Sequence, residues 1–204
     1  MRLQDLCFAA MVGLALLFPA AAQAQHKNLQ SGPMVGYTDM MEVLLWVQTK
    51  QEATVAFEYW ETTLPKNIFR TDYVRTEKGS GYTAKGIADQ VLPGRAYQYR
   101  VLIDNQRVTL PYPTEFKTQT LWQWRTDPPA FTMATGSCAY TNDEPYDRPG
   151  KPYGADSQIF SSIHAKKPDV MLWLGDNVYL REVDWFTKTG MLYRYTHARS
   201  QPEL

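Results

Sequence analysis

Residues 168–179, PDVMLWLGDNVY, decide how the second half of the chain folds. Within them, residues 170–174 are continuously apolar, which is typical of a parallel strand that is buried on both faces of its sheet. Gly175 and Asp176 follow at once, and a glycine at this point lets the backbone turn sharply away from the sheet. The stretch therefore predicts a buried parallel strand that ends in a polar turn.

The residues before this strand predict the rest of a strand–helix–strand unit. Residues 131–135 have the character of a strand, and residues 140–154, YTNDEPYDRPGKPYG, form a polar loop rich in Pro and Gly. Residues 156–168 predict a helix that is capped by its first Asp or Ser and ended by Lys-Lys-Pro. We expect the two strands to be parallel neighbours joined by a right-handed crossover, which makes a βαβ unit.

A second amphipathic helix is expected after the apolar strand, from Asp184 onward. Its inward-facing residues would be Trp185, Phe186, Met191, Leu192 and Tyr195. One βαβ unit cannot cover both faces of its own sheet. We therefore expect residues 130–204 to be the start of an α/β domain, and the chain to be the N-terminal part of a longer protein.

Residues 126–129, TDPP, mark the expected boundary with a different fold, because tandem prolines stiffen the chain and cannot donate to a sheet ladder. Before this boundary, apolar and polar residues alternate in short segments that turn residues separate. The inward positions are Val43, Leu45, Val47, Val55, Phe57, Tyr59, Tyr97, Tyr99, Val101 and Ile103. This pattern predicts an all-β, antiparallel sandwich at residues 28–122.

Residues 92–99, LPGRAYQY, resemble the turn and following strand of fibronectin type III domains. In sandwiches of this kind a tyrosine hydroxyl holds a corner of the fold through a bond to the backbone. The resemblance implies that the first domain is a sandwich of the fibronectin III or immunoglobulin type.

Residues 1–24 have the pattern of a secretory signal peptide: a basic start, an apolar run, and a small-x-small site that ends at Ala24. The run is short for a membrane span, so we expect cleavage after Ala24 rather than an uncleaved anchor, and no transmembrane segment in the mature chain. The protein would be exported to the periplasm or the medium. Cleavage would remove Cys7 and leave Cys138 without a disulfide partner.

Composition excludes several classes of protein. The chain has 204 residues, of which 44% are hydrophobic and 13% aromatic, so it is neither disordered nor a coiled coil. Its 21 Lys and Arg balance 21 Asp and Glu, which argues against a nucleic acid as the partner because phosphate binding needs a basic excess.

Three side chains that can carry chemistry follow the two strands of the expected βαβ unit. Cys138 follows the first strand, and Asp176 and Tyr179 follow the second. Ligands bind at the carboxyl ends of the strands in an open α/β sheet, where we expect the three groups to converge. A thiolate, a carboxylate and a phenolate held together raise one another's pKa, and a cation removes this conflict. A phenolate favours a hard ion such as Fe³⁺, so the sequence predicts a metal site.

Gly-Asp-x-x-Tyr after a buried strand resembles the second motif of metallophosphoesterases of the purple acid phosphatase kind. Together with FTMATGSC at residues 131–138, it is similar more narrowly to the alkaline phosphatase D (PhoD-like) family, in which a β-sandwich also precedes the catalytic domain. The resemblance implies a metal-dependent hydrolase of phosphate mono- or diesters. Cys138, Asp176 and Tyr179 would be ligands of a dinuclear site, and Asp176 would bridge Fe³⁺ and Ca²⁺ or another divalent ion. The ions would hold the phosphate and activate a water molecule for in-line attack.

The resemblance also implies that further ligands, in an Asp-Asp-His motif and C-terminal histidines, lie beyond Leu204. We expect His164 to stabilise a helix end, and His197 to lie in a solvated basic run with Arg194 and Arg199. No histidine here is therefore a candidate ligand. Four charged residues of the long loop either shape a substrate entrance or are solvated: Asp143, Glu144, Asp147 and Arg148.

Two other functions stay open from the sequence. The chain could be a secreted binding module in which the sandwich carries the function and the βαβ unit is a remnant. Alternatively, Cys138 could be a nucleophile, although that role needs a base and no histidine lies near it in the sequence. Phosphate-binding Gly-rich loops, Gly-x-Ser-x-Gly elbows and Cys-x-x-Cys motifs are missing from the sequence.

Overall fold

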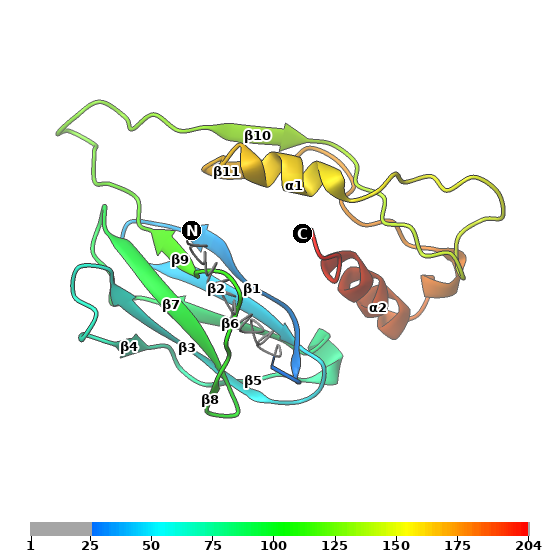
Figure 1. Ribbon diagram of the computed structural model, residues 1–204, viewed down its shortest axis with the longest axis horizontal. Coiled ribbons are helices and arrows are strands. Elements are labelled where there is room, and N and C mark those ends of the chain that lie inside the picture. Colours follow the sequence, from blue (N-terminus) through cyan, green and yellow to red (C-terminus); the bar gives the residue numbers. More distant parts are fainter. Residues whose placement is uncertain (1–25, 204) are drawn as a thin grey trace, which may run out of the picture.

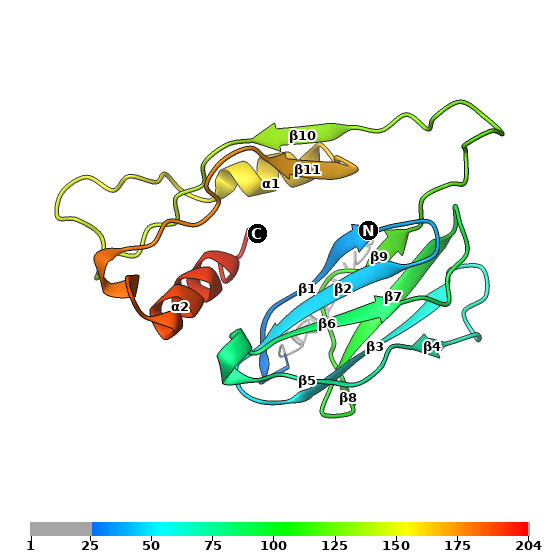
Figure 2. The same ribbon diagram turned by 180° about the vertical axis from the view of Figure 1, so that it is seen from behind.

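The computed structural model describes residues 26–203, and the expected signal peptide at residues 1–24 lies outside them. The described chain consists of a β-sandwich followed by a smaller layer of two strands and one helix, with a last helix beside both (Figures 1 and 2). None of the helices among the described residues is long and apolar enough to cross a membrane.

The first sheet of the sandwich has three antiparallel strands in the order β1-β2-β6. They are β1 (Leu29–Thr38), β2 (Val43–Thr49) and β6 (Thr83–Ala88). A short 3₁₀ helix, η1 (Lys78–Ser80), precedes β6. Gly81 after η1 has a φ of 66°, a left-handed conformation that glycine adopts without strain.

The second sheet is built around the antiparallel pair β3 (Thr54–Glu61) and β7 (Ala96–Ile103). Short strands extend it: β4 (Phe69–Arg70) and β5 (Val74–Arg75) pair with β3, and β8 (Gln106–Arg107) and β9 (Glu115–Lys117) pair with β7. The two sheets enclose one hydrophobic core, to which all ten of the inward positions expected from the sequence contribute: Val43, Leu45, Val47, Val55, Phe57, Tyr59, Tyr97, Tyr99, Val101 and Ile103.

The tyrosine corner that the fibronectin-like stretch predicts is present. The Tyr97 hydroxyl accepts a hydrogen bond from the backbone N–H of Leu92 at 2.8 Å. The Tyr97 ring stacks on Phe116 of β9, with the ring centroids 5.2 Å apart. The antiparallel sandwich predicted from the alternating pattern is therefore confirmed.

Two parallel strands and a helix follow the sandwich. β10 (Met133–Gly136) pairs in parallel with β11 (Val170–Trp173), and α1 (Gln158–Ala165) lies between them in the sequence. Phe160 of α1 meets Trp173 of β11 edge to face, with the ring centroids 6.1 Å apart. This arrangement is the strand–helix–strand order that the sequence predicts, and α1 begins after Ser157 as expected.

The prediction that β11 is buried on both faces is wrong for the described residues. Its side chains alternate in burial, and Val170 and Leu172 are 43% and 45% exposed. A continuous apolar run has no periodicity that tells which faces are covered, because coverage depends on neighbouring elements. Here α1 contacts one face, and the face that carries Val170 and Leu172 is exposed.

The predicted helix from Asp184 also differs from the structure. A 3₁₀ helix, η2 (Glu182–Asp184), comes first, and α2 (Lys188–Arg199) begins only after Thr187. Four of the five residues expected to face inward are exposed, with Trp185 at 48% and Phe186 at 97%, and Met191 and Tyr195 more than a third exposed. The buried residues of α2 are Arg194 and Ala198, because the helix turns an arginine toward two buried carboxylates.

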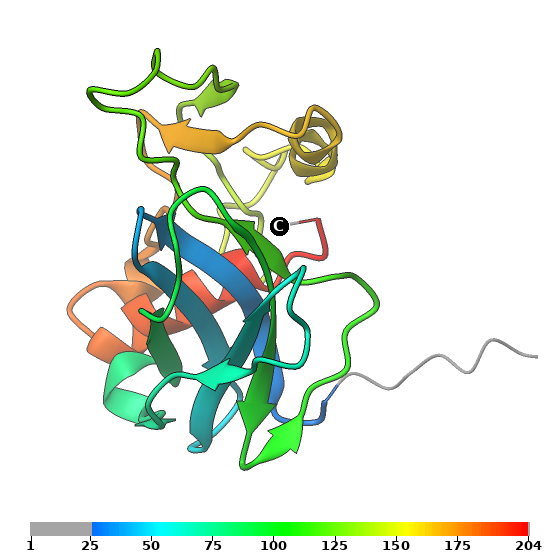
Figure 3. The same ribbon diagram turned by 90° about the vertical axis from the view of Figure 1, so that its left-hand side faces the viewer.

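The helix α2 packs against the first sheet of the sandwich, beside η1 (Figure 3). The Gln48 side chain of β2 donates a hydrogen bond to the Thr196 hydroxyl at 2.8 Å. The Arg199 guanidinium lies 5.2 Å from the ring centroid of Trp46, and a Cβ on Gly81 would lie 3.2 Å from Leu192. These contacts join the sandwich to the region that follows β11.

Candidate functional site

The candidate site lies where β10 and β11 end side by side. The ladder continues past both strands, because Leu174 donates its N–H to the Gly136 carbonyl at 2.7 Å and Ala139 donates to the Asp176 carbonyl at 2.8 Å. Two turns are thereby held together, one carrying Cys138 and the other carrying Asp176. This is the carboxyl edge of the parallel pair, where ligands bind in open α/β sheets.

Gly175 allows the two turns to approach each other closely. A Cβ at this position would lie 2.7 Å from the Ser137 hydroxyl oxygen and 3.1 Å from the Cys138 sulfur. The first distance is shorter than carbon and oxygen tolerate, so a side chain at position 175 would force the Ser137 hydroxyl to move and would press on the Cys138 sulfur. Gly175 lies in the turn that the sequence predicts, and the structure adds this close approach.

The three predicted site residues come together at this edge. Cys138 and Asp176 are exposed and Tyr179 is half-buried. A hydrogen bond with Tyr179 is the main cause of a lowered pKa of the Cys138 thiol, and the Ser137 hydroxyl and the Asp176 backbone add to it. The same bond raises the pKa of Tyr179 to about 12, with burial and the charges of Cys138 and Asp176 acting in the same direction.

The chemistry of these donors fits a metal ion. The Cys138 thiol and the Tyr179 phenol lie close together beside the Asp176 carboxylate, and a cation among them would be held by sulfur and two kinds of oxygen. Their number does not complete a site. Within residues 26–203, no group of three or more His, Cys, Asp and Glu side chains is arranged to hold a metal ion.

Arg181 is hydrogen-bonded to the backbone that follows each of the two turns. Its guanidinium donates to the Thr141 carbonyl at 2.9 Å on the Cys138 side, and to the Tyr179 carbonyl on the other side. It also forms an ion pair with Asp147 at 2.8 Å and lies 4.0 Å from the ring centroid of Tyr140. The guanidinium is almost fully buried, so each of these contacts is made out of reach of water.

A second buried arginine anchors the long loop to α2. Arg194 pairs with Asp143 at 2.9 Å and with Asp184 at 2.7 Å, and all three are buried. The His197 ring nitrogen Nε2 lies 2.9 Å from the Asn142 carbonyl. The expectation that Arg194 and His197 lie in a solvated run is therefore wrong, because the long loop covers this face of α2.

The four charged residues of the loop divide into two pairs. Asp143 forms an ion pair with Arg194, and Asp147 forms one with Arg181; both pairs hold the loop in place. Glu144 and Arg148 are exposed. From the sequence, either an entrance role or a solvated loop was open for these four residues. For the two aspartates the structure shows a third role, buried ion pairing.

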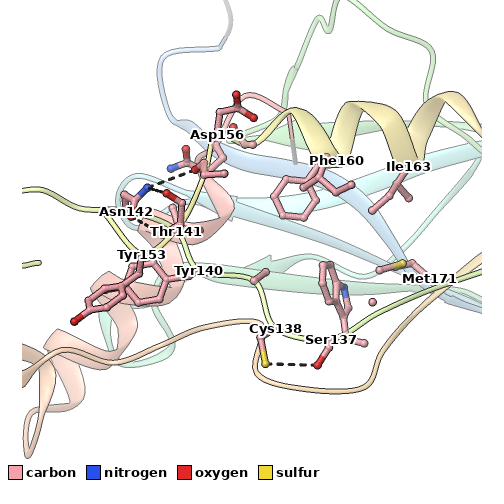
Figure 4. A pocket seen from close by; sticks show the side chains of 18 of the residues that line it. Ser137, Cys138, Tyr140, Thr141, Asn142, Tyr153, Asp156, Phe160, Ile163 and Met171 are labelled. Carbon is pink, nitrogen blue, oxygen red and sulfur yellow. Dashed lines mark hydrogen bonds between the residues drawn. The ribbon is translucent and has the colours of Figure 1, made fainter. Parts of the chain in front are cut away.

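Two cavities flank the site. The larger, of about 760 Å³, is lined by Cys138, by Phe160 and Ile163 of α1, and by Met171 and Trp173 of β11 (Figure 4). The smaller, of about 390 Å³, is lined by Tyr179. Tyr140 and Tyr153 contribute to both cavities, and in Figure 4 their rings lie next to each other.

Sequence reasoning missed the two buried arginines. Arg181 is far in the sequence from its partner Asp147, and Arg194 is far from Asp143. No periodicity in the sequence indicates that these residues pair. The one signal near the site was the position of Arg181, two residues after Tyr179.

Comparisons with known proteins place the fold more firmly than the function. A family model described as a domain of unknown function (DUF7800) matches residues 26–121, which comprise the sandwich. The solved structure of PhoD is similar to this chain with a TM-score of 0.65 and 17% identity, over 87% of this chain and 36% of PhoD. The described chain therefore has a PhoD-like fold, and it spans little more than a third of the PhoD chain.

Other likenesses cover only part of the chain. The sensor domain of the anti-sigma factor RsgI4 of Pseudobacteroides cellulosolvens matches 46% of this chain, and 94% of its own, at 14% identity and a TM-score of 0.36. The fn3 domain of human contactin 1 matches 58% of this chain, and 98% of its own, at 17% identity and a TM-score of 0.33. None of the curated proteins matches the sequence.

Proposed function

We propose that the chain is the N-terminal part of an exported, metal-dependent hydrolase of phosphoric esters. The observation that carries this proposal is the convergence of Cys138, Asp176 and Tyr179 at the carboxyl edge of β10 and β11. The PhoD-like fold supports it, because it puts a sandwich before a βαβ unit in the same order. Residues 130–204 would then be the start of a metallophosphoesterase domain.

In this proposal Cys138, Asp176 and Tyr179 are metal ligands, with Fe³⁺ and Ca²⁺ or another divalent ion as the metals. Bound ions would supply Lewis-acid chemistry at the phosphate and at an attacking water molecule. The exposed carboxylate of Asp176 is close to both other donors, since its negative charge raises the pKa of Cys138 and of Tyr179. The remaining ligands would come from the part of the protein that corresponds to the rest of PhoD.

The surrounding residues would hold these donors in place. Gly175 keeps the two turns in contact, and Arg181 fixes the backbone on both sides of the site. Cys138 acts here as a ligand and not as a nucleophile. Among residues 26–203 no His side chain belongs to a metal-type cluster, and the side chain with the largest effect on the pKa of the Cys138 thiol is a phenol rather than a base.

Hydrolysis of p-nitrophenyl phosphate and bis-p-nitrophenyl phosphate tests the proposal. The protein is purified from the exported fraction of its own cells, stripped with a chelator and reloaded with Fe³⁺ and Ca²⁺. We expect activity that depends on metal and that Asp176→Asn and Tyr179→Phe reduce by about 100-fold or more. Asp127→Asn, an exposed change in the segment between the two folds, serves as the control.

A binding module would give a different result. Its sandwich would fold cooperatively without metal, and neither ester would be hydrolysed under any loading. In that case the proposal is wrong, and the sandwich should be screened for ligands instead.

We further propose that the protein is exported after removal of residues 1–24. Intact mass of the exported protein would then correspond to a chain that begins at Gln25. A mass that includes Met1, in a membrane fraction, would contradict this.

A further inference from the structure

The smaller cavity has walls that are mostly aromatic. Five of its lining residues are Tyr140, Tyr146, Tyr153, Tyr179 and Trp185, and it encloses about 390 Å³. This volume lies within the range of roughly 300–1,000 Å³ that is usual for small-molecule sites. A pocket of this kind favours a flat ring, because aromatic side chains contact other rings by stacking or edge to face.

One wall of the pocket is rigid. The Tyr140 hydroxyl donates to Asp147 at 2.9 Å, and the Arg181 guanidinium covers its ring. The Tyr140 ring centroid lies 5.5 Å from that of Tyr153 and 5.4 Å from that of Tyr179. These contacts fix the orientation of Tyr140 before any ligand arrives, which reduces the entropy that binding must overcome.

Other lining residues are open to solvent, and two of them carry charge. Trp185 and Tyr146 are 48% and 44% exposed. The Arg148 and Glu182 side chains are 73% and 58% exposed, and their ion pair is long, at 3.8 Å. An exposed pair of this kind is weak. The Arg148 guanidinium can therefore leave Glu182 and reach an anion at the mouth of the pocket.

Tyr179 connects the pocket to the candidate site. It lines the pocket, and its hydroxyl lies close enough to the Cys138 thiol for each group to shift the pKa of the other. A molecule whose phosphate lies beside Cys138 and Asp176 can therefore place a group bonded to that phosphate in the aromatic pocket.

We propose that this pocket binds the flat aromatic part, an aryl ring or a nucleobase, of the phosphate ester that the site handles. The inference rests on the proposed function and names its substrate class: esters in which the phosphate is joined to an aryl or nucleoside group. Stacking on aromatic side chains tolerates any ring, so aryl and nucleobase groups share the same recognition chemistry.

Binding of three phosphate monoesters to the metal-free protein tests the inference without relying on activity. The ligands are phenyl phosphate, adenosine 5′-monophosphate and glycerol phosphate, which has no ring, and binding is followed by NMR of the tryptophan indole N–H signals. We expect the two ring-bearing esters to bind about tenfold more tightly than glycerol phosphate, and to shift the Trp185 signal. Tight binding of only one of them also supports an aromatic site and shows which ring it fits.

Matched variants locate the binding. Trp185→Ala and Tyr153→Ala, both at exposed side chains, should each weaken the ring-bearing esters several-fold and leave glycerol phosphate unchanged. Trp124→Ala, at a fully exposed tryptophan outside the pocket, should change nothing. Equal binding of all three esters, or equal behaviour of Trp185→Ala and Trp124→Ala, would overturn the inference.

Adenosine and phenol, which carry no phosphate, separate this inference from the proposed function. If they bind in a Trp185-dependent way while the metal-loaded protein hydrolyses no ester, the pocket is real and the proposed function fails. If esters are hydrolysed at rates that do not depend on a ring or on Trp185, the proposed function survives and this inference is wrong.

Discussion

At the scale of single residues, Arg181 is the side chain on which most contacts of the site depend. It meets two carbonyls, one carboxylate and one ring, and it is buried. Removing one partner of a buried ion pair leaves the other charge without compensation, at a cost of roughly 3–5 kcal/mol. We therefore expect Arg181→Met to open the loop locally.

Amide hydrogen exchange checks this prediction. The N–H groups of Asp143 and Asp147 are bonded within the loop and should exchange much faster in Arg181→Met. Arg148→Met is the control, because Arg148 lies in the same region and its pair with Glu182 is exposed. Unchanged exchange in both variants would mean that Arg181 does not hold the loop.

Gly175 gives a second prediction at this scale. Gly175→Ala would bring a carbon against the Ser137 hydroxyl and the Cys138 sulfur, so both side chains would have to move. Displaced supporting groups reduce metal affinity by about 10–100-fold, and we expect a loss of this size for Fe³⁺ in a direct titration. Gly79→Ala is the control, since a Cβ there would meet nothing within 4 Å. Equal Fe³⁺ affinity in the two variants would contradict the close approach.

Glu58 in β3 makes the stability of the sandwich depend on pH. Burial opposes its ionisation, but hydrogen bonds and charges from Arg70 and Arg100 outweigh burial and hold the pKa of Glu58 below its ordinary value. The stabilisation is complete above the unfolded-state pKa of about 4.3 and is lost as the pH falls through the lower folded-state pKa.

Urea unfolding at pH 7 and near pH 3 measures this effect. Glu58→Gln should be less stable than the parent at pH 7, and the difference should shrink in acid. Glu52→Gln, in an exposed pair with Arg75, should change little at either pH. A Glu58→Gln difference that is the same at both pH values would contradict the assignment.

At the scale of elements, what could be predicted depended on the kind of pattern. The alternation in β2, β3 and β7 predicted the core correctly, because alternate residues of a strand share one face and only one of the two faces is apolar. The continuous run in β11 carried no such information, and its exposed face was missed. In α2 the buried position is an arginine, which hydrophobic periodicity assigns to the outside.

The same reasoning explains what was found of the site. Cys138, Asp176 and Tyr179 were located correctly beside one another, because the carboxyl ends of parallel strands share an edge. The buried pairs of Arg181 and Arg194 could not be predicted, because the paired residues are far apart in the sequence and meet only in the folded chain.

The contact between α2 and the sandwich carries a prediction at the element scale. The Thr196 hydroxyl accepts from Gln48 and donates to the Leu192 carbonyl. Thr196→Val keeps the shape and removes both bonds, which should cost roughly 0.5–1.5 kcal/mol each and raise amide exchange in α2. Thr189→Val, at an exposed position of the same helix, is the control. Identical exchange in the two variants would show that Gln48 does not fasten α2.

At the scale of the whole molecule, the sandwich is joined to the site through α2. Gln48 and Trp46 of β2 hold Thr196 and Arg199, and Arg194 of the same helix holds Asp143 in the loop that follows Cys138. The sandwich thus supports the helix from one side, and the loop near the candidate site rests on the other. In the proposed function the first domain serves to position the second.

The central claim is that Cys138, Asp176 and Tyr179 form a metal centre, and visible absorption of the Fe³⁺-loaded exported protein tests it most directly. A phenolate bound to Fe³⁺ absorbs visible light by charge transfer, so we predict a band in the parent protein that Tyr179→Phe abolishes and Tyr153→Phe leaves in place. A band that survives Tyr179→Phe, or no band in a protein shown by metal analysis to hold iron, would contradict the account.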